Sequence, residues 1–161
     1  MTLITGFVEH LARLGLPHGL NVDDQVELHF AWQNLACRVI AVERGPLIVL
    51  AAPTIARVPS ACMDETIRLT NALNATILTS GSFWVEPSAH FLGFELPILA
   101  PGGTSAEQVG LAIMTLTLID VLYPAFARVW WAGISAEEAI VELRKAGSGQ
   151  DGCDGSESLE V

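Results

Sequence analysis

Three adjoining segments with strand patterns, at residues 26–32, 35–43 and 47–52, constrain the fold more than any other feature of this sequence. In the first segment apolar residues alternate with polar ones, which is typical of a strand with one buried face. The third segment, Leu-Ile-Val-Leu-Ala-Ala, is continuously apolar and favours a central strand covered on both faces. Short turns at residues 33–34 and 44–45 separate the three segments. Together they predict an antiparallel meander.

Helical patterns flank this meander. Four helices are expected, at residues 3–14, 60–74, 104–122 and 135–146. The third helix opens with two overlapping capping boxes, Thr104 with Glu107 and Ser105 with Gln108, and residues 135–138 form another. After the third helix, the proline at position 124 either kinks the helix or starts a short one to residue 131.

Two more strands are expected at residues 75–85 and 90–98, with a possible bulge at residues 80–82, and residues 19–24 are expected to form a loop. The order α-β-β-β-α-β-β-α-α predicts an α+β fold with one antiparallel sheet packed against helices. Residues 1–146 are expected to form one domain. The acidic, glycine-containing segment 147–161 is expected to be a flexible tail.

The charge of the chain excludes several classes of partner. Eighteen acidic residues against eight basic ones give a net charge of −10 over 161 residues. A nucleic-acid binder needs a basic face, as does a protein held on an anionic membrane, so neither partner is expected. The early Glu9 argues against a signal peptide, and the apolar run 109–122 is shorter than a membrane span and contains Asp120. With three scattered cysteines, these features predict a cytoplasmic protein.

Residues able to carry chemistry do not converge in the sequence. The four histidines, at positions 10, 18, 29 and 90, have no second ligand at metal-binding spacing, and His10 is assigned to the solvent side of the first helix. Cys37 lies within a strand and is expected in the core. Cys62 lies near a helix start, but no base can be named for it. We expect no catalytic residue, no metal and no cofactor.

The apolar residues exceed what one small core needs. The strand at residues 35–43 is apolar on both sides, so a helix pair or a second subunit must cover its far face. Trp130 and Trp131 are adjacent and point about 100° apart on a helix, so both cannot face one core equally well. A core position for all the tryptophans is an equal alternative. We take Trp130, Trp131, Leu47 and Val49 as candidate partner-binding residues and a homodimer as the default assembly.

Several segments resemble the YbjN family, whose α+β fold is shared with type III secretion chaperones. They are residues 66–74, where asparagines close the middle helix, residues 103–108, and residues 123–140. The last segment is similar to the family's closing stretch of a tyrosine-proline helix, a tryptophan-glycine pair and a capped helix, although Ala132 separates Trp131 from Gly133. The resemblance covers about residues 1–146. It implies a noncatalytic, dimeric, protein-binding module of the kind called sensory transduction regulators.

The leading hypothesis is therefore a chaperone-like or regulatory module that binds client or partner proteins as a homodimer. Clients are expected along an apolar groove or a sheet edge. The alternative is a small-molecule or nucleotide sensor whose pocket lies between the sheet and the long helix, with Arg38 or Arg128 contacting an anion. An enzyme is the third possibility and would require a pocket with two converging titratable groups.

Overall fold

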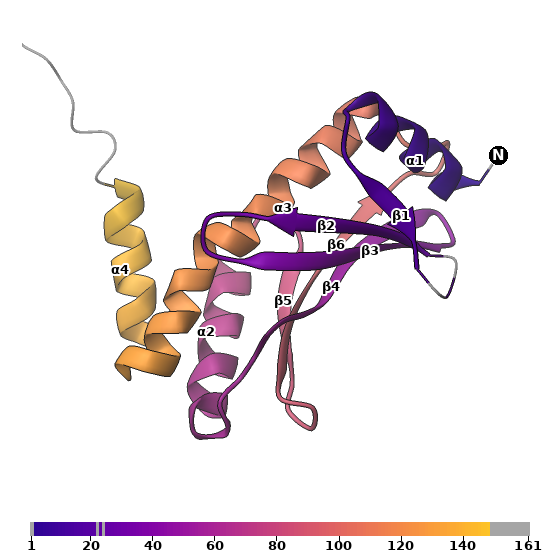
Figure 1. Ribbon diagram of the computed structural model, residues 1–161. Helices are drawn as coiled ribbons and strands as arrows, with labels where there is room; N and C mark the ends of the chain where they lie inside the picture. The colour runs from indigo at the N-terminus through magenta and orange to yellow at the C-terminus, as the bar shows by residue number, and fades with distance from the viewer. Residues whose placement is uncertain (1, 22, 24, 149–161) are drawn as a thin grey trace, which may run out of the picture.

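A computed structural model describes residues 2–21, 23 and 25–148, so most of the expected acidic tail lies outside the described residues. Within these residues six antiparallel strands form one sheet in the order β1-β2-β3-β4-β6-β5 (Figure 1). The strands are β1 (His18–Leu20), β2 (Val26–Ala31), β3 (Ala36–Arg44), β4 (Leu47–Arg57), β5 (Ser82–Glu86) and β6 (Phe91–Leu99). The helices are α1 (Leu3–Arg13), α2 (Met63–Thr76), α3 (Ala106–Ala127) and α4 (Ala136–Ser148), with short turns η1 (Ser60–Cys62) and η2 (Arg128–Ala132).

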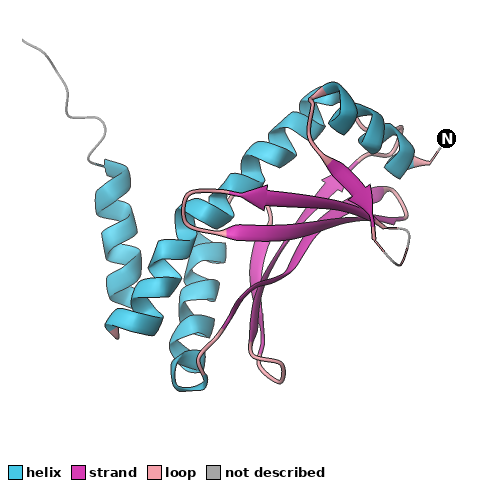
Figure 2. Cartoon of the chain, viewed as in Figure 1, coloured by secondary structure: helices cyan, strands magenta, loops and turns pink. Residues whose placement is uncertain are grey.

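The predicted α+β class and the antiparallel meander are confirmed. The strands β2, β3 and β4 pair in sequence order, and the helices lie along one side of the sheet (Figure 2). The core fills the space between these two layers. Its largest fully buried side chains include Phe7, Leu28, Leu50, Leu69, Phe94, Leu116 and Phe126. The apolar run at residues 47–52 forms the first half of β4, which pairs with β3 on one side and β6 on the other.

The sheet has one strand more than expected, because residues 18–20 form β1 and not part of a loop. This edge strand pairs with β2, with His18 opposite Leu28. All three of its residues are exposed, so it has no apolar alternation that could reveal it in the sequence. Its backbone pairing with β2 defines it as a strand.

The prediction of a strand at residues 75–85 is wrong for the first half of this segment. The helix α2 continues to Thr76, and β5 begins only at Ser82. Between them, Gly81 has a φ of +73°, and a Cβ at this position would lie 2.4 Å from Cζ of Phe94. Residues 80–82 are therefore a tight entry to β5 that needs glycine, and the irregular pairing that the sheet does contain lies in β4 between Ala52 and Ala56.

The proline at position 124 lies inside α3 and does not start a new helix. Proline has no N–H, so the main-chain carbonyl of Asp120 loses the donor that residue i+4 normally supplies. Asn34, at the tip of the β2–β3 hairpin, supplies a replacement: its Nδ2 donates to that carbonyl at 3.2 Å. The Asn34 backbone N–H also donates to Oδ1 of Asp120 at 2.8 Å. The β2–β3 hairpin is thus attached to α3 at the carbonyl that lacks its helical donor.

Two of the three predicted capping boxes form. Ser105 and Gln108 cap α3 reciprocally, and Ser135 and Glu138 do the same for α4. Hydrogen bonds from the Ser135 backbone N–H and hydroxyl hold the pKa of Glu138 below its ordinary value. The Thr104 box does not form, since its hydroxyl is buried without a hydrogen-bond partner in the described structure.

His10 is half-buried and does not lie on the solvent side of α1 as expected. Its Nε2 donates to the Thr104 carbonyl at 3.0 Å, which ties α1 to the start of α3. The combined helical segment Ala106–Ala132 is long and apolar enough to cross a membrane by length and composition. In this fold, however, it packs against the sheet, with Val109, Leu116 and Ile119 fully buried.

Candidate functional site

The face of the sheet that points away from the helices has an apolar centre. We name it the outer sheet face; its members are Ile40, Val42, Leu47, Val49, Pro97 and Leu99. Residues paired across neighbouring strands share a face, and the pairs here are Val42 with Val49, Val49 with Pro97, and Leu47 with Leu99. The helices approach the opposite face, where the Ile4 N–H donates to Glu43 and the side chain of Asn74 binds the main chain of Phe83.

The two sheet residues predicted as partner-binding, Leu47 and Val49, both lie on the outer sheet face. Leu47 is half-buried, and Val49 is 7 % exposed between its register neighbours on β3 and β6. Leu99, beside Leu47, is 60 % exposed. In the described part of the chain no helix lies over this surface. The far side of the strand at residues 35–43 is therefore not covered by a helix pair.

Charged side chains border the outer sheet face on the β2 side. Glu27 accepts from His29 at 2.7 Å and forms an ion pair with Arg38 at 3.5 Å. Glu27 lies opposite Ile40 in the register, so the charged group adjoins the apolar centre directly. An apolar centre with a polar border is the usual anatomy of a protein-binding surface.

The tryptophan pair is divided between the core and the surface by a π-helical turn, η2, which Gly133 ends at a φ of +68°. Trp130 is 7 % exposed, and its Nε1 donates to Oγ1 of Thr66 at 2.8 Å. Thr66 in turn donates to the Cys62 carbonyl at 2.7 Å. Trp130 is thus buried within this chain, whereas Trp131 is 76 % exposed.

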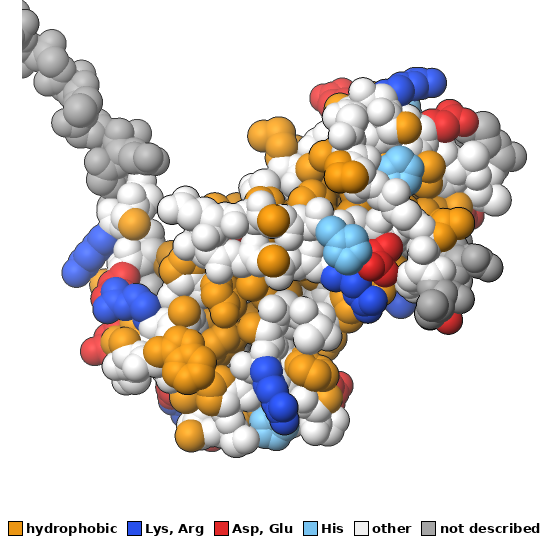
Figure 3. Space-filling view, in the orientation of Figure 1, with side chains coloured by type: hydrophobic (Ala, Val, Ile, Leu, Met, Phe, Trp, Pro, Cys, Tyr) orange, Lys and Arg blue, Asp and Glu red, His pale blue; other side chains and the backbone are white. Residues whose placement is uncertain are grey.

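Trp131 lines a shallow hollow of about 460 Å³ together with Arg57, Pro59, Ser60 and His90. These residues come from the end of β4, from the segment before η1 and from the turn before β6. Figure 3 shows that hydrophobic side chains gather between the β2–β3 hairpin and α2. An exposed tryptophan in a hollow is a typical anchor for a partner side chain.

The candidate chemical groups remain apart. Burial raises the pKa of the Cys37 thiol to about 11, which keeps it protonated and unreactive. The Cys62 thiol points at the Trp130 carbonyl, with Sγ 3.8 Å from the oxygen. His29 lies beside Glu27 on the outer sheet face. His90, in the turn before β6, contacts the Ser60 hydroxyl, with its Nδ1 3.4 Å from the Ser60 Oγ. Within the described residues no three metal-ligating side chains come together.

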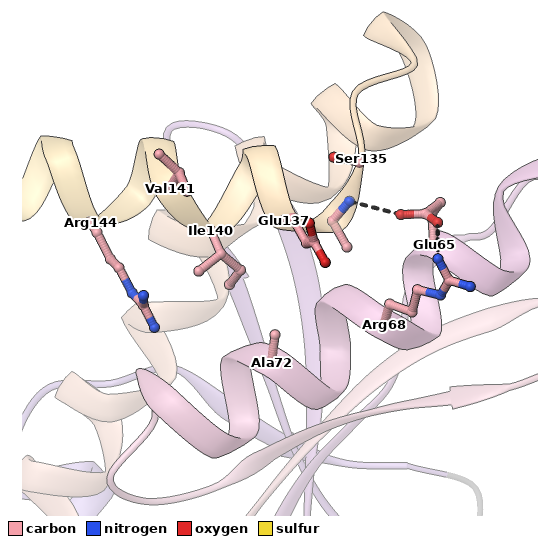
Figure 4. A pocket seen from close by; sticks show the side chains of 9 residues that line it. Glu65, Arg68, Ala72, Ser135, Glu137, Ile140, Val141 and Arg144 are labelled. Atoms are coloured by element: carbon pink, nitrogen blue, oxygen red, sulfur yellow. Dashed lines mark hydrogen bonds and ion pairs between the residues drawn. The ribbon is translucent and has the colours of Figure 1, made fainter.

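A hollow of about 550 Å³ lies between α2 and α4 (Figure 4). Glu65 fastens the two helices: one carboxylate oxygen accepts from the Ala136 N–H at 2.8 Å, and the other pairs with Arg68 at 3.0 Å. Arg144 extends from α4 into the same space (Figure 4). The contact of Glu65 with α4 has no signal in the sequence, because it joins segments 71 residues apart.

The groove where a sensor's pocket was expected, between the sheet and the long helix, does not contain the expected arginines. The groove between the sheet and α3 is about 140 Å³ and is lined by uncharged residues that include Leu96, Gln108, Leu111 and Thr115. The two arginines expected there lie elsewhere. One, Arg38, pairs with Glu27, and the other, Arg128, pairs with Glu142 of α4.

The sequence of α3 does not separate its exposed side from its buried side. Leu111, Met114 and Val121 are 64 %, 70 % and 58 % exposed, and Leu111 also borders the groove between α3 and the sheet. A signal was present in their spacing, but the helix is apolar on nearly every side, so no single stripe stands out in the sequence. These residues form the second uncovered apolar surface of the described chain.

The fold and its surfaces define a class: a small α+β protein with uncovered apolar surfaces and no cluster of metal-ligating side chains among the described residues. Residues 7–128 match the model of the YbjN family, described as "Putative bacterial sensory transduction regulator". The chain therefore belongs to the YbjN family. The matched segment ends before Trp130, so most of residues 123–140, which carried much of the resemblance, lie beyond it.

A solved structure supports this fold assignment. The chain is similar to "Crystal structure of YbjN, a putative transcription regulator from E. coli", with a TM-score of 0.56 and 13 % sequence identity. The similarity covers 75 % of this chain and 92 % of that one. None of the curated proteins matches the chain.

Proposed function

We propose that this member of the YbjN family is a noncatalytic, cytoplasmic regulator that works as a homodimer and binds an apolar segment of a partner or client protein on its outer sheet face. The observation that carries the proposal is the uncovered apolar surface of Leu47 and Leu99 beside the buried Val49, bordered by the Glu27 charges. Covering these side chains removes apolar area from water, at about 25 cal/mol per Å². The family description as a regulator supports a role exercised through another molecule.

Binding of an incompletely folded client protein would be a chaperone-like activity, as the resemblance to a family that shares its fold with type III secretion chaperones implies. An extended client segment can lie across the outer sheet face or add to the edge strand β5, which pairs only with β6. Trp131 gives such a client a second contact, at the end of β4. The scattered histidines and the protonated Cys37 thiol support a noncatalytic role.

The test is suppression of aggregation of a chemically unfolded, apolar client protein, followed by light scattering. Leu47→Asp places a charge on the outer sheet face, and we expect it to weaken client binding at least about tenfold. Val141→Asp is the matched control, because Val141 is 46 % exposed on α4 and lies away from this face. Circular dichroism verifies that both variants fold. Equal protection by wild type and Leu47→Asp, or no protection by wild type, refutes the proposal.

The hollow between α2 and α4 favours a second candidate function, a small-molecule sensor. Arg68 and Arg144 line it together with Glu65 and Glu137, so both signs of charge face the space. A thermal-shift screen of charged metabolites tests this candidate, because a ligand that binds only the folded state raises the unfolding midpoint. A ligand whose effect is lost in Arg68→Ala supports the sensor. If no metabolite raises the unfolding midpoint, the sensor is refuted and only the protein-binding proposal remains.

A further inference from the structure

The helix α3 carries two apolar stripes on opposite sides. The inner stripe packs on the sheet and consists of Val109, Ala112, Leu116 and Ile119, all buried. The outer stripe, which we name the α3 seam, consists of Leu111, Met114, Leu118 and Val121. Each seam residue follows an inner one by two positions, which corresponds to about 200° around the helix. Three of the four seam side chains are more than half exposed, and the seam points away from the sheet except at its start, where Leu111 also borders the groove between α3 and β6.

The spacing of the α3 seam is that of a helix-pairing surface. Its residues are separated by three, four and three positions, which is the a/d pattern of a coiled coil. An a/d stripe fits knobs-into-holes packing against another helix better than it fits an extended peptide or a flat surface. The occupant that this surface fits is thus a second apolar helix.

The charges along α3 indicate that this second helix is another copy of α3. Residues 108–119 contain no Asp, Glu, Lys or Arg, so the seam offers no charged flank that would select a different, oppositely charged helix. The whole chain carries a net charge of −10, so two copies repel each other over most of their surface. The uncharged seam is where they can meet with least repulsion.

The ends of the α3 seam determine the direction of pairing. Glu107 lies four residues before Leu111 at one end of the seam, and Arg128 lies seven residues after Val121 at the other, with its side chain 51 % exposed beside Glu142. Parallel pairing would place Glu107 beside its own copy. Antiparallel pairing brings Glu107 of one copy within a helical turn of Arg128 of the other, and also opposes the two helix dipoles.

We propose that two copies of the chain associate through antiparallel pairing of α3 across the α3 seam, with Leu111 facing Val121 and Met114 facing Leu118. The proposal gives the homodimer of the proposed function its interface, and it rests on that function. Three exposed side chains per copy form a short interface, so the association depends on concentration. Its two-fold axis lies near residue 116.

Sedimentation equilibrium of the full chain from about 1 to about 300 µM, a range that covers micromolar dissociation constants, tests the interface. We expect wild type to approach twice its mass of 17.2 kDa. Met114→Asp should weaken the dissociation constant at least about 100-fold, because it buries an unpaired charge. Leu20→Asp is the matched control: Leu20 is 69 % exposed on β1, against 70 % for Met114, and should leave association unchanged.

Distances between spin labels test the direction of pairing, in a variant whose three cysteines are replaced by alanine. With a rise of 1.5 Å per residue about an axis near residue 116, labels at Glu107→Cys are offset along the helix axis by about 27 Å between copies, against about 3 Å for labels at Thr117→Cys, so the Glu107→Cys distance is much the longer. Parallel pairing gives similar distances at both positions, which would overturn the antiparallel arrangement.

The outcomes separate the two proposals. A wild type that stays at monomer mass refutes both the homodimer and the α3 seam as its interface, and client binding on the outer sheet face is judged by its own assay. A dimer that Met114→Asp leaves intact refutes the seam alone, provided that circular dichroism shows a folded variant. Loss of the dimer in Met114→Asp but not in Leu20→Asp supports the seam.

Discussion

Replacing Asn34 by alanine is expected to destabilise the protein by an amount that depends on residue 124. In wild type, the Asn34 side chain is the donor to the Asp120 carbonyl, whose helical donor is missing because residue 124 is proline. Asn34→Ala removes this donor, so the main-chain carbonyl of Asp120, in a buried part of α3, loses its hydrogen bond. An unsatisfied buried acceptor costs about 1–3 kcal/mol of unfolding free energy.

The cost is smaller when residue 124 can donate. Pro124→Ala restores an N–H four residues after Asp120, and it should itself stabilise the protein because an interior proline strains a helix. In that background Asn34→Ala loses only a replaceable hydrogen bond, worth about 0.5–1.5 kcal/mol. The two substitutions should therefore show a coupling energy of about 1 kcal/mol in a double-mutant cycle.

Urea unfolding at one fixed protein concentration measures the four free energies, provided that the m-values agree. Gln33→Ala is the control for the hairpin turn: Gln33 is exposed, and its change should stay within about 0.5 kcal/mol. A coupling energy below about 0.3 kcal/mol, the scatter expected for independent sites, would refute the reasoning that Asn34 replaces the missing helical donor.

Three further predictions concern the core and its backbone. Trp130→Phe should lower the unfolding free energy by about 1–3 kcal/mol, measured by urea unfolding, because the fully buried Thr66 hydroxyl loses its indole donor; an unchanged midpoint contradicts this. Gly81→Ala should lower the melting temperature more than Gly15→Ala. Both glycines have a positive φ, but only at Gly81 would the added Cβ lie 2.4 Å from a ring carbon. Equal losses would show that the positive φ alone, and not the contact with the ring, determines the effect. Burial raises the pKa of Cys37 from 9.0 to about 11, so its contribution to stability is intact below pH 9 and is lost as the pH rises toward 11. Cys37→Ala should accordingly show a shallower loss of unfolding free energy than wild type over that interval, and parallel curves would contradict the shift.

The parts of the fold that could be predicted are those with a local cause. Alternation in β2, the apolar run of β4 and the Ser105 and Ser135 caps are visible within a few residues. The edge strand β1 was missed because its residues are all exposed and only their backbone pairing defines it. Residues 75–81 look like a strand because they contain β-forming residues, but α2 continues into them and Gly81 must admit the Phe94 ring.

The candidate site follows the same division. Leu47 and Val49 belong to the continuously apolar run that predicted a strand at residues 47–52, whereas the π-helical turn that separates Trp130 from Trp131 has no signal in the sequence. The contact of Asn34 with Asp120 joins residues 86 positions apart, and the proline that makes it necessary gave only a choice between a kink and a new helix. Long-range hydrogen bonds depend on how the elements pack and so escape local patterns.

The two uncovered apolar surfaces lie on opposite sides of a two-layer fold, and this arrangement bears on how they can be used. The outer sheet face is the far side of one layer, and the α3 seam is the far side of the other. A partner on one does not block the other. If two copies pair through the α3 seam, their outer sheet faces point outward, so both stay accessible to client segments. A single surface serving both purposes would force dimerisation and client binding to compete, whereas the separation predicts that Met114→Asp and Leu47→Asp impair different measurements.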